Sequence, residues 1–349
     1  MALRIVGLSP PSQPPRAWWW GFAALFAAFL LTMPIYFDIA VLFSVTNYLV
    51  LALLALSMSF LWGYGGMLSF GQTAFFGLGG YTYAVMALNL HETTGAMIVA
   101  IVLPMLFAAV LGYFMIYGRI SDIYFSVITL VVTLILEKGI RATSGDQYVV
   151  GSVRLNGQNG IPTTPALQVP WNPKVQLEID DVFYLAAILL VLTYVGLRLL
   201  LITRFGRILV SIRDNERRSA LLGYDTRRYK LLAFVIAAGV AGLGGAMWGV
   251  WGNFVGPNMF NLGQAAQVVI WVIVGGKSTL IGPIGGTIAV QYLTDWLGTQ
   301  GVGQVSLVLG IVLMVMVMLF QQGLLPSVGL IAAMARDALS GARRHRAPP

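Results

Sequence analysis

Long apolar runs alternate with short polar segments along most of this 349-residue chain. A straight helical span of a bilayer needs about 20 apolar residues, and most of these runs reach that length. The pattern predicts an all-α polytopic membrane protein with about ten transmembrane helices, of which the eighth and ninth are short enough to be tilted, broken or paired. The expected spans are residues 17–37, 39–62, 72–90, 96–117, 123–136, 182–202, 231–251, 265–274, 284–297 and 305–325.

Two polar segments interrupt the apolar pattern. Residues 141–181 contain the turn signals Asn156-Gly157 and Asn159-Gly160 and several X-Pro steps, which predict an irregular loop. Residues 203–230 are rich in arginine and cannot lie in hydrocarbon. Neither segment reaches the roughly 50 residues of a small soluble domain, so residues 1–349 are expected to form a single transmembrane domain.

The basic residues predict the orientation of the spans, because cytoplasmic loops of membrane proteins carry an excess of lysine and arginine. If the spans alternate from a cytoplasmic N-terminus, the basic residues fall on the cytoplasmic side with the exceptions of Lys138, Arg141, Arg154 and Lys174. Both termini, including the tail of residues 326–349, and the loop 203–230 are therefore predicted to be cytoplasmic, and the loop 141–181 periplasmic. Lipid headgroups explain the net charge of +8 better than nucleic acid does.

The composition narrows the possible chemistry. The sequence has no cysteine, which excludes disulfides, thiolate metal sites and cysteine nucleophiles. His91 and His345 form no ligand cluster, so neither a metal nor a cofactor is expected, and no arrangement of catalytic groups points to an enzyme. Glu137 and Asp295 lie near the expected outer ends of spans, where a salt-bridged or water-facing role is favoured over a proton relay.

Two further motifs predict no activity of their own. Residues 276–278 read Gly-Lys-Ser like the end of a phosphate-binding loop, but Trp271 stands where that motif requires glycine, and the segment follows an apolar span rather than a strand. The pairs Gly245 with Gly249 and Gly282 with Gly286 have GxxxG spacing. This spacing predicts close packing between helices.

The cytoplasmic loop 203–230 contains a helical pattern. The residues at helical spacing are Phe205, Leu209, Ile212 and Glu216. They predict an amphipathic helix whose apolar face is surrounded by arginine. Gly223 is expected to end this helix, and Asp225 or Thr226 to cap the next one. Such a helix suits two roles equally well, docking of a soluble partner or anchoring at the membrane surface.

Residues 63–81 are dense in glycine, which allows either close helix packing or a break in a helix that lines a solute path. Uncharged polar side chains at membrane depth need partners or water. The candidate path consists of Ser69, Gln72, Thr73, Ser126, Thr129, Asn253 and Gln267, with Phe75, Tyr124 and Trp271 as apolar neighbours. Because this lining offers no counter-ion, it is expected to admit small neutral or zwitterionic molecules and to reject charged ones.

Five stretches carry a resemblance to a known family. They are G-Y-x-G-x-L-S-x-G-x-x-x-F-F-G-x-G-x-Y at 63–81, YFSVITL at 124–130, FGRILVSIRDNE at 205–216, LGYDTRRYKLLAFVIAA at 222–238 and VGGKSTLIGPIGG at 274–286. In this order they resemble the LivM-type permeases of branched-chain amino-acid ABC importers. Gln72 stands where the family often has histidine, and residues 141–165 are longer than the family pattern. Parts of the sequence are also similar to the urea-type branch of the family.

The resemblance implies a permease subunit of the bacterial inner membrane that is not itself an enzyme. It implies two ATP-binding cassette subunits, a second homologous permease and a periplasmic solute-binding protein as partners. The helix of the cytoplasmic loop would be the coupling helix that docks on the ATPase, which implicates Arg213, Asp214, Glu216, Arg217 and Gly223. Branched-chain amino acids are the expected solutes, urea or short amides are the alternative, and a stand-alone carrier or channel is less favoured.

Overall fold

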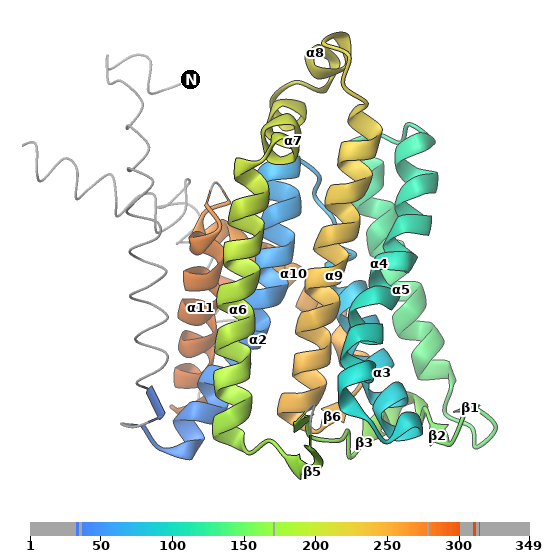
Figure 1. Cartoon of the computed structure of the whole chain (residues 1–349), viewed down its shortest axis with the longest axis vertical. Coiled ribbons are helices and arrows are strands. Elements are labelled where there is room, and N and C mark those ends of the chain that lie inside the picture. The colour runs from blue at the N-terminus through green and yellow to red at the C-terminus, as the bar shows by residue number, and fades with distance from the viewer. Residues whose placement is uncertain are drawn as a thin grey trace, which may run out of the picture.

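The computed structural model describes residues 33–34, 37–169, 172–277, 279–300, 310–311 and 314, which form a bundle of long helices (Figure 1). The expected spans 17–37 and 305–325 lie almost entirely outside these residues, as does the tail 326–349. The helices are α2 (Ile39–Ser59), α3 (Gln72–Leu90), α4 (Thr93–Tyr117), α5 (Asp122–Ala142), α6 (Ile179–Ile202), α7 (Arg204–Asp214), α8 (Glu216–Leu221), α9 (Thr226–Gly252), α10 (Leu262–Gly275) and α11 (Ile281–Thr299). Shorter elements are the π-helix η2 (Phe60–Tyr64), the 3₁₀ turns η3 (Gly157–Asn159) and η4 (Pro257–Phe260), and the strands β1 (Val149–Val150), β2 (Val153–Arg154), β3 (Ile161–Pro162), β4 (Gln168–Val169), β5 (Asn172–Gln176) and β6 (Phe254–Val255).

Among the described residues, five helices are long and apolar enough to cross a membrane. They are α2 continued by η2 (Ile39–Tyr64), α4, α5, α6 and α9. The helix α10 is apolar but shorter. Each of these helices coincides closely with an expected span. The chain is therefore a polytopic membrane protein, whereas the count of about ten spans stays a prediction.

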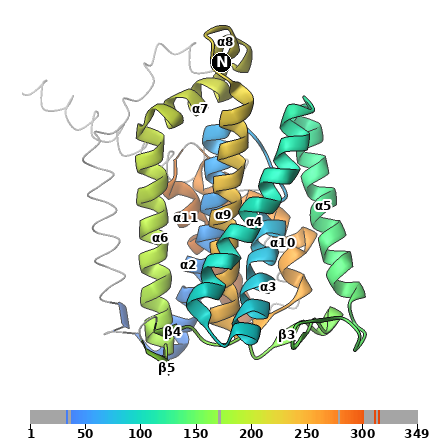
Figure 2. The same cartoon turned by 45° about the vertical axis from the view of Figure 1, so that its right-hand side comes forward.

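Helix α3 lies inside the bundle, where it packs against α4 and α9 (Figure 2). Most of its residues are buried, from Gln72 at its start to Ala87 near its end. A helix that is enclosed by other helices does not need a continuous apolar surface, because its polar groups face protein rather than lipid. This position explains why α3 can carry glycine, threonine and glutamine at membrane depth.

Glycine residues bring α9 close to α3. An added Cβ on Gly245 would overlap the carbonyl oxygen of Phe76, and one on Gly79 would overlap the backbone of Gly242. These contacts confirm the packing role predicted from the spacing of Gly245. The aromatic ring of Phe234 on α9 fills the neighbouring space, with its centroid 5.3 Å from that of Phe75 in an edge-to-face arrangement.

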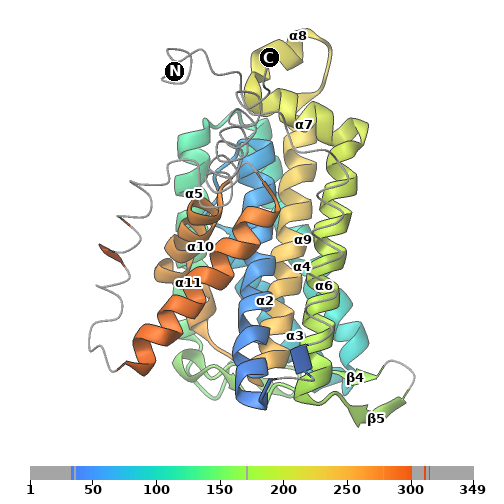
Figure 3. The same cartoon turned by 90° about the vertical axis from the view of Figure 1, so that its left-hand side faces the viewer.

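The two ends of the bundle differ in structure and charge. Helices α7 and α8 lie at one end, together with most of the arginine residues of the segment 203–230 (Figure 1). The short strands lie at the opposite end, and α10 and α11 run antiparallel between the two ends (Figure 3). The opposite end carries the acidic residues Asp38, Glu92, Asp146, Glu178, Asp180 and Asp181. The described helices thus run alternately between these two ends.

The segment between α5 and α6 is more regular than expected. Strands β1 and β2 pair with each other, and β4 pairs with β5. Strand β3 pairs with β6, which follows α9 in the chain, and Ile161 lies opposite Val255. The prediction of an irregular loop was therefore wrong in this respect. Pairing supplies partners for backbone groups where the segment covers the end of the bundle. The predicted turns are present, since Asn156, Gly157 and Gly160 have positive φ angles.

Candidate functional site

A break in the helical structure forms the centre of the candidate site. Helix α2 widens into the π-helix η2, which ends at Tyr64, and α3 begins only at Gln72. Between them Gly66 has a φ of +75°, a conformation that glycine adopts without steric cost. π-Helical turns and glycines are common causes of such interruptions. The glycine density of residues 63–81 thus corresponds to a broken helix as well as to close packing.

A polar face of α5 lies against this break. The Ser126 hydroxyl donates a hydrogen bond of 2.8 Å to the carbonyl oxygen of Leu68, and the Thr133 hydroxyl donates one of 3.3 Å to that of Phe70. The Thr129 Cβ would lie 3.2 Å from a Cβ added to Gly71. Thr133 was missed in the sequence, although it continues the spacing of the other two. These side chains satisfy carbonyl groups that the broken helix leaves free.

The start of α3 adds further buried polar groups. Ser69, Gln72 and Thr73 are each at most 1% exposed, and the Gln72 Oε1 lies 3.2 Å from the Ser57 hydroxyl oxygen of α2. The Gln72 Nε2 has no hydrogen-bond partner among the described residues, and no side chain caps the first turn of α3. Buried groups of this kind can hydrogen-bond a small polar solute at low desolvation cost. The structure therefore brings together Ser69, Gln72, Thr73, Ser126 and Thr129.

The two remaining path candidates lie elsewhere. Asn253 is exposed at the end of α9, and its carbonyl oxygen accepts a hydrogen bond of 3.0 Å from the Thr164 amide near the short strands. Gln267 is half-buried on α10 and makes no hydrogen bond to the part of the chain that the structure describes. Of the expected apolar neighbours, Phe75 and Trp271 are buried, whereas Tyr124 is 66% exposed on the outer side of α5. The expectation that Tyr124 is an apolar neighbour of the path was therefore wrong.

The two acidic residues noted near the outer ends of the expected spans, Glu137 and Asp295, each have a hydrogen-bond partner. Glu137 is buried and accepts a hydrogen bond of 2.9 Å from Arg141 Nε one helical turn away. Asp295 accepts one of 2.5 Å from the hydroxyl of Tyr48. The salt-bridged role expected for Glu137 is confirmed. Among the described residues, no group of three or more histidine, cysteine or acidic side chains could hold a metal ion.

The arginine-rich segment forms two helices rather than one. Helix α7 lies across the end of the bundle, where Leu209 and Ile212 are buried (Figure 2). The helix stops at Asn215, whose side chain accepts a hydrogen bond of 2.8 Å from the Arg218 amide and caps α8. The prediction of a single helix through Glu216 was therefore wrong, because asparagine favours the extended backbone of an N-cap over helix continuation. Helix α7 therefore covers the end of the bundle, whereas α8 is a separate helix that projects from it.

Helix α8 projects beyond the bundle and is fixed at its base (Figure 1). Glu216 forms a 2.5 Å ion pair with Lys230 at the start of α9, and the hydroxyl oxygens of Ser211 and Ser219 lie 2.9 Å apart. The tip exposes Leu221 and Leu222, which are 82% and 67% exposed. Adjacent exposed leucines at the end of a helix whose base is fixed by polar contacts are typical of a protein contact site. These leucines were not among the predicted site residues, although two leucines before a glycine in a polar loop are a usable signal.

The predicted coupling residues occupy different parts of this structure. Arg213 and Asp214 end α7 and form an ion pair of 2.8 Å, whereas Glu216 and Arg217 begin α8 and the Arg217 side chain is exposed. Gly223 follows α8 with a φ of +89°. Asp225 caps α9, as expected, by accepting a hydrogen bond from the Arg228 amide. The candidate coupling region therefore has one part, α7, that lies against the bundle and another part, α8, that projects away from it.

The position of Gly223 allows a test of backbone conformation alone. A Cβ at Gly223 would meet no atom within 4 Å, so a side chain there causes strain only through the positive φ angle. Gly223→Val is expected to destabilise the α8–α9 turn by roughly 1 kcal/mol or more and to lower transport, with normal insertion into the membrane. Uptake and membrane content are the measurements. Wild-type uptake by an inserted Gly223→Val variant would show that this turn has no coupling role.

Comparisons with known proteins agree with this geometry. Residues 40–320 match the family described as the permease component of branched-chain amino acid transport systems. The high-affinity branched-chain amino acid transport system permease proteins LivM of Escherichia coli K12 and Salmonella typhimurium LT2 are each 26% identical to the chain. The alignments cover 78% and 80% of this chain and 67% and 69% of the relatives. No solved structure matches the chain. The chain therefore belongs to the LivM-type permeases of branched-chain amino-acid ABC transporters.

Proposed function

We propose that this chain is the membrane-spanning subunit of an ATP-driven importer that carries branched-chain amino acids into the cytoplasm. Helix α8 carries the proposal, because its exposed leucines are held away from the bundle, as docking on a soluble ATPase requires. In this proposal the loop 203–230 couples the chain to two ATPase subunits. A second homologous permease completes the membrane part, and a periplasmic binding protein delivers the solute.

The charge distribution supports the orientation of this importer. The arginine-rich end with α7 and α8 faces the cytoplasm of the inner membrane, in keeping with the excess of basic residues on that side of membrane proteins. The end with the short strands, which includes the loop 141–181, then faces the periplasm. In this orientation both termini and the tail 326–349 are cytoplasmic.

The buried polar residues at the helix break support a small solute without net charge. Ser69, Gln72, Thr73, Ser126 and Thr129 offer hydrogen bonds, and their surroundings include the apolar ring of Phe75. A solute with a net charge would lose its hydration without gaining an ionic partner. A zwitterionic amino acid suits this lining. The curated relatives are named for branched-chain amino acids, so this solute class is preferred to urea or short amides.

Reconstitution tests the proposal. The purified chain alone in liposomes is expected to move no solute, whereas the complete complex with its ATPase subunits and binding protein takes up leucine when ATP is present. Excess unlabelled isoleucine or valine should abolish the uptake of labelled leucine, and glutamate, lysine and urea should leave it unchanged. ATP-independent uptake by the chain alone would contradict the importer. Saturable uptake of glutamate or lysine without a response to leucine would contradict the solute class.

A further inference from the structure

Arg213 joins the cytoplasmic helices to the break between α2 and α3. Its Nη1 donates a hydrogen bond of 2.7 Å to the carbonyl oxygen of Gly63 in η2. Its Nε and Nη2 lie 3.0 Å and 2.8 Å from the Asp214 Oδ1. The guanidinium group is thus held between the end of α7 and the end of α2. Such a fork of directed N–H groups is specific to arginine, because lysine offers a single charged nitrogen.

The Gly63 carbonyl depends on this contact. At the end of η2, the Gly65 amide lies within hydrogen-bond range of the carbonyls of Phe60, Leu61 and Trp62, and not of the Gly63 carbonyl. Gly63 is buried. A helix leaves its final carbonyl groups without partners inside the helix, and Arg213 supplies the partner here. The backbone of Arg213 is close as well, since a Cβ on Gly66 would lie 3.3 Å from the Arg213 Cα.

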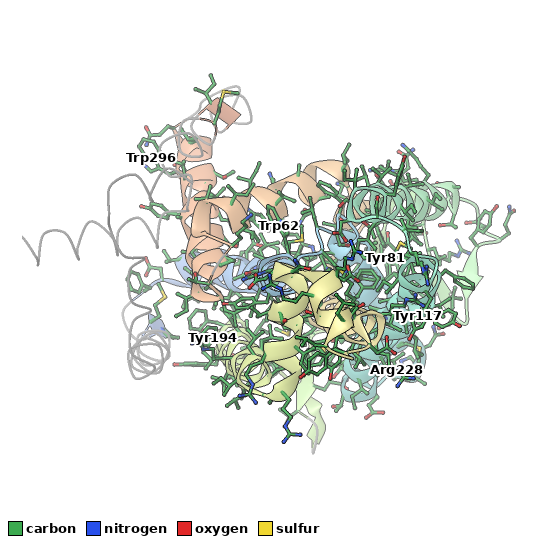
Figure 4. All side chains as sticks on the ribbon, turned by 90° about the horizontal axis from the view of Figure 1, so that it is seen from above. Trp62, Tyr81, Tyr117, Tyr194, Arg228 and Trp296 are labelled. Carbon is green, nitrogen blue, oxygen red and sulfur yellow. The ribbon has the colours of Figure 1, made fainter. Side chains whose placement is uncertain are left out.

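The turn between α10 and α11 meets the same point. The Lys277 carbonyl oxygen lies against the α-carbon of Gly63, where an added Cβ would overlap it, and the Lys277 Nζ lies 5.1 Å from the centroid of the Trp62 ring. Seen from the end that carries α8, Trp62 lies near the middle of the bundle and Trp296 at its edge (Figure 4). The end of η2 is therefore enclosed by α7 on one side and by the α10–α11 turn on the other.

Continuous contacts lead from α8 to the buried polar residues. Asn215 caps α8 and directly follows Asp214, which holds Arg213. Arg213 in turn contacts Gly63 and Gly66, after which the non-helical segment runs to Ser69. A movement of α8 acts on the adjoining Arg213–Asp214 pair, and the hydrogen bond from Arg213 to the Gly63 carbonyl links this pair to the end of η2. Packed elements with directed hydrogen bonds transmit such shifts between two arrangements.

We propose that Arg213 is a positioning residue that transmits closure of the ATPase subunits to the helix break at residues 63–71. The inference rests on the proposed importer function and adds an inward role for a residue of α7, distinct from docking by α8. Arg213 contacts neither the solute nor ATP. It determines whether ATP hydrolysis is converted into a change at Ser69 and Gln72.

The test measures solute moved per ATP hydrolysed in the reconstituted complete complex. Arg213→Gln removes the charge and the fork, and it is expected to lower this ratio at least tenfold, with assembly and basal ATPase activity preserved. Arg213→Lys should give an intermediate ratio. Arg207→Gln on the same helix is the matched control, because Arg207 is exposed and its side chain makes no hydrogen bond or ion pair to the described residues. A merely structural role of Arg213 would reduce the amount of complex but leave the ratio unchanged.

A second measurement tests the proposal if the Arg213→Gln variant folds poorly. Hydrogen exchange of residues 63–73 in the wild-type complex should change when a non-hydrolysable ATP analogue is added, and the Arg213→Lys complex should show a smaller change. An unchanged ratio in Arg213→Gln, or equal exchange in wild type and Arg213→Lys, would overturn the proposal. Loss of ATPase binding in Arg213→Gln would overturn it too, by making Arg213 a docking residue. Failure of the importer function is distinguishable, because the wild-type and Arg207→Gln complexes would then also move no solute.

Discussion

Gly245→Ala is expected to separate α9 from α3 and to destabilise the bundle by about 3 kcal/mol. A Cβ at this position would overlap the carbonyl oxygen of Phe76 and lie 3.0 Å from the amide nitrogen of Gly80. Both atoms belong to the backbone of α3, so no side-chain rotation can relieve the collision. The midpoint temperature of unfolding in detergent, followed by tryptophan fluorescence or size-exclusion chromatography, measures the effect.

Gly196→Ala provides the matched control for this change. Gly196 is an exposed glycine within α6, and a Cβ there would meet no atom within 4 Å. Alanine replaces glycine in a helix interior with a gain of roughly 0.5–1 kcal/mol, so the midpoint should stay or rise slightly. If Gly245→Ala and Gly196→Ala gave the same midpoint, α3 and α9 would not cross as closely as the structure indicates.

The hydrophobic pattern predicted most of the helical bundle. The run of residues 72–90 corresponds to α3, and the run 182–202 falls within α6 (Ile179–Ile202). Long apolar segments can satisfy their backbone groups in a bilayer only as helices, which makes such runs strong signals. Residues 161–162 are a different case, because their strand partner β6 follows α9 and a pairing so distant in the chain leaves no local pattern.

The helix break was only partly predictable. Glycine density indicated that residues 63–81 could break, but it did not indicate that η2 contacts residues distant in sequence, such as Arg213 at the carbonyl of Gly63. For the same reason Arg213 and Arg217 were grouped together as coupling residues, and the contact between Arg213 and Gly63 was not foreseen. Local spacing shows which residues share a helix face but not which neighbouring element that face meets. The end of α7 at Asn215 did have a local signal, since Asn-Glu is a common helix start.

The candidate path residues also show that local spacing cannot predict which elements come into contact. Ser126 and Thr129 share a face of α5 by their spacing, and the structure places them beside the break together with Ser69. Asn253 and Gln267 were grouped with them only because they are uncharged polar residues next to apolar spans. The structure assigns Asn253 to the turn after α9, where its positive φ and its backbone bond to Thr164 give it a structural role.

Replacing both leucines at the tip of α8, Leu221→Asp with Leu222→Asp, is expected to abolish binding of the ATPase subunits. Each leucine that becomes buried in an interface contributes about 1.5–3 kcal/mol, so losing both weakens binding by roughly a hundredfold or more. The aspartates would add a desolvation cost in the same contact. Co-purification of the ATPase subunits with the tagged chain, at normal membrane content, measures this effect.

Leu262→Asp is the control for this double change, because Leu262 is an exposed leucine, 47% accessible, at the start of α10. The control should retain the ATPase subunits in full. The double variant also separates docking from transmission, since it should lose the ATPase whereas Arg213→Gln retains it without productive transport. Undiminished co-purification with both leucines replaced would show that the ATPase binds elsewhere. The exposed tip of α8 would then have to be explained by contact with the membrane surface.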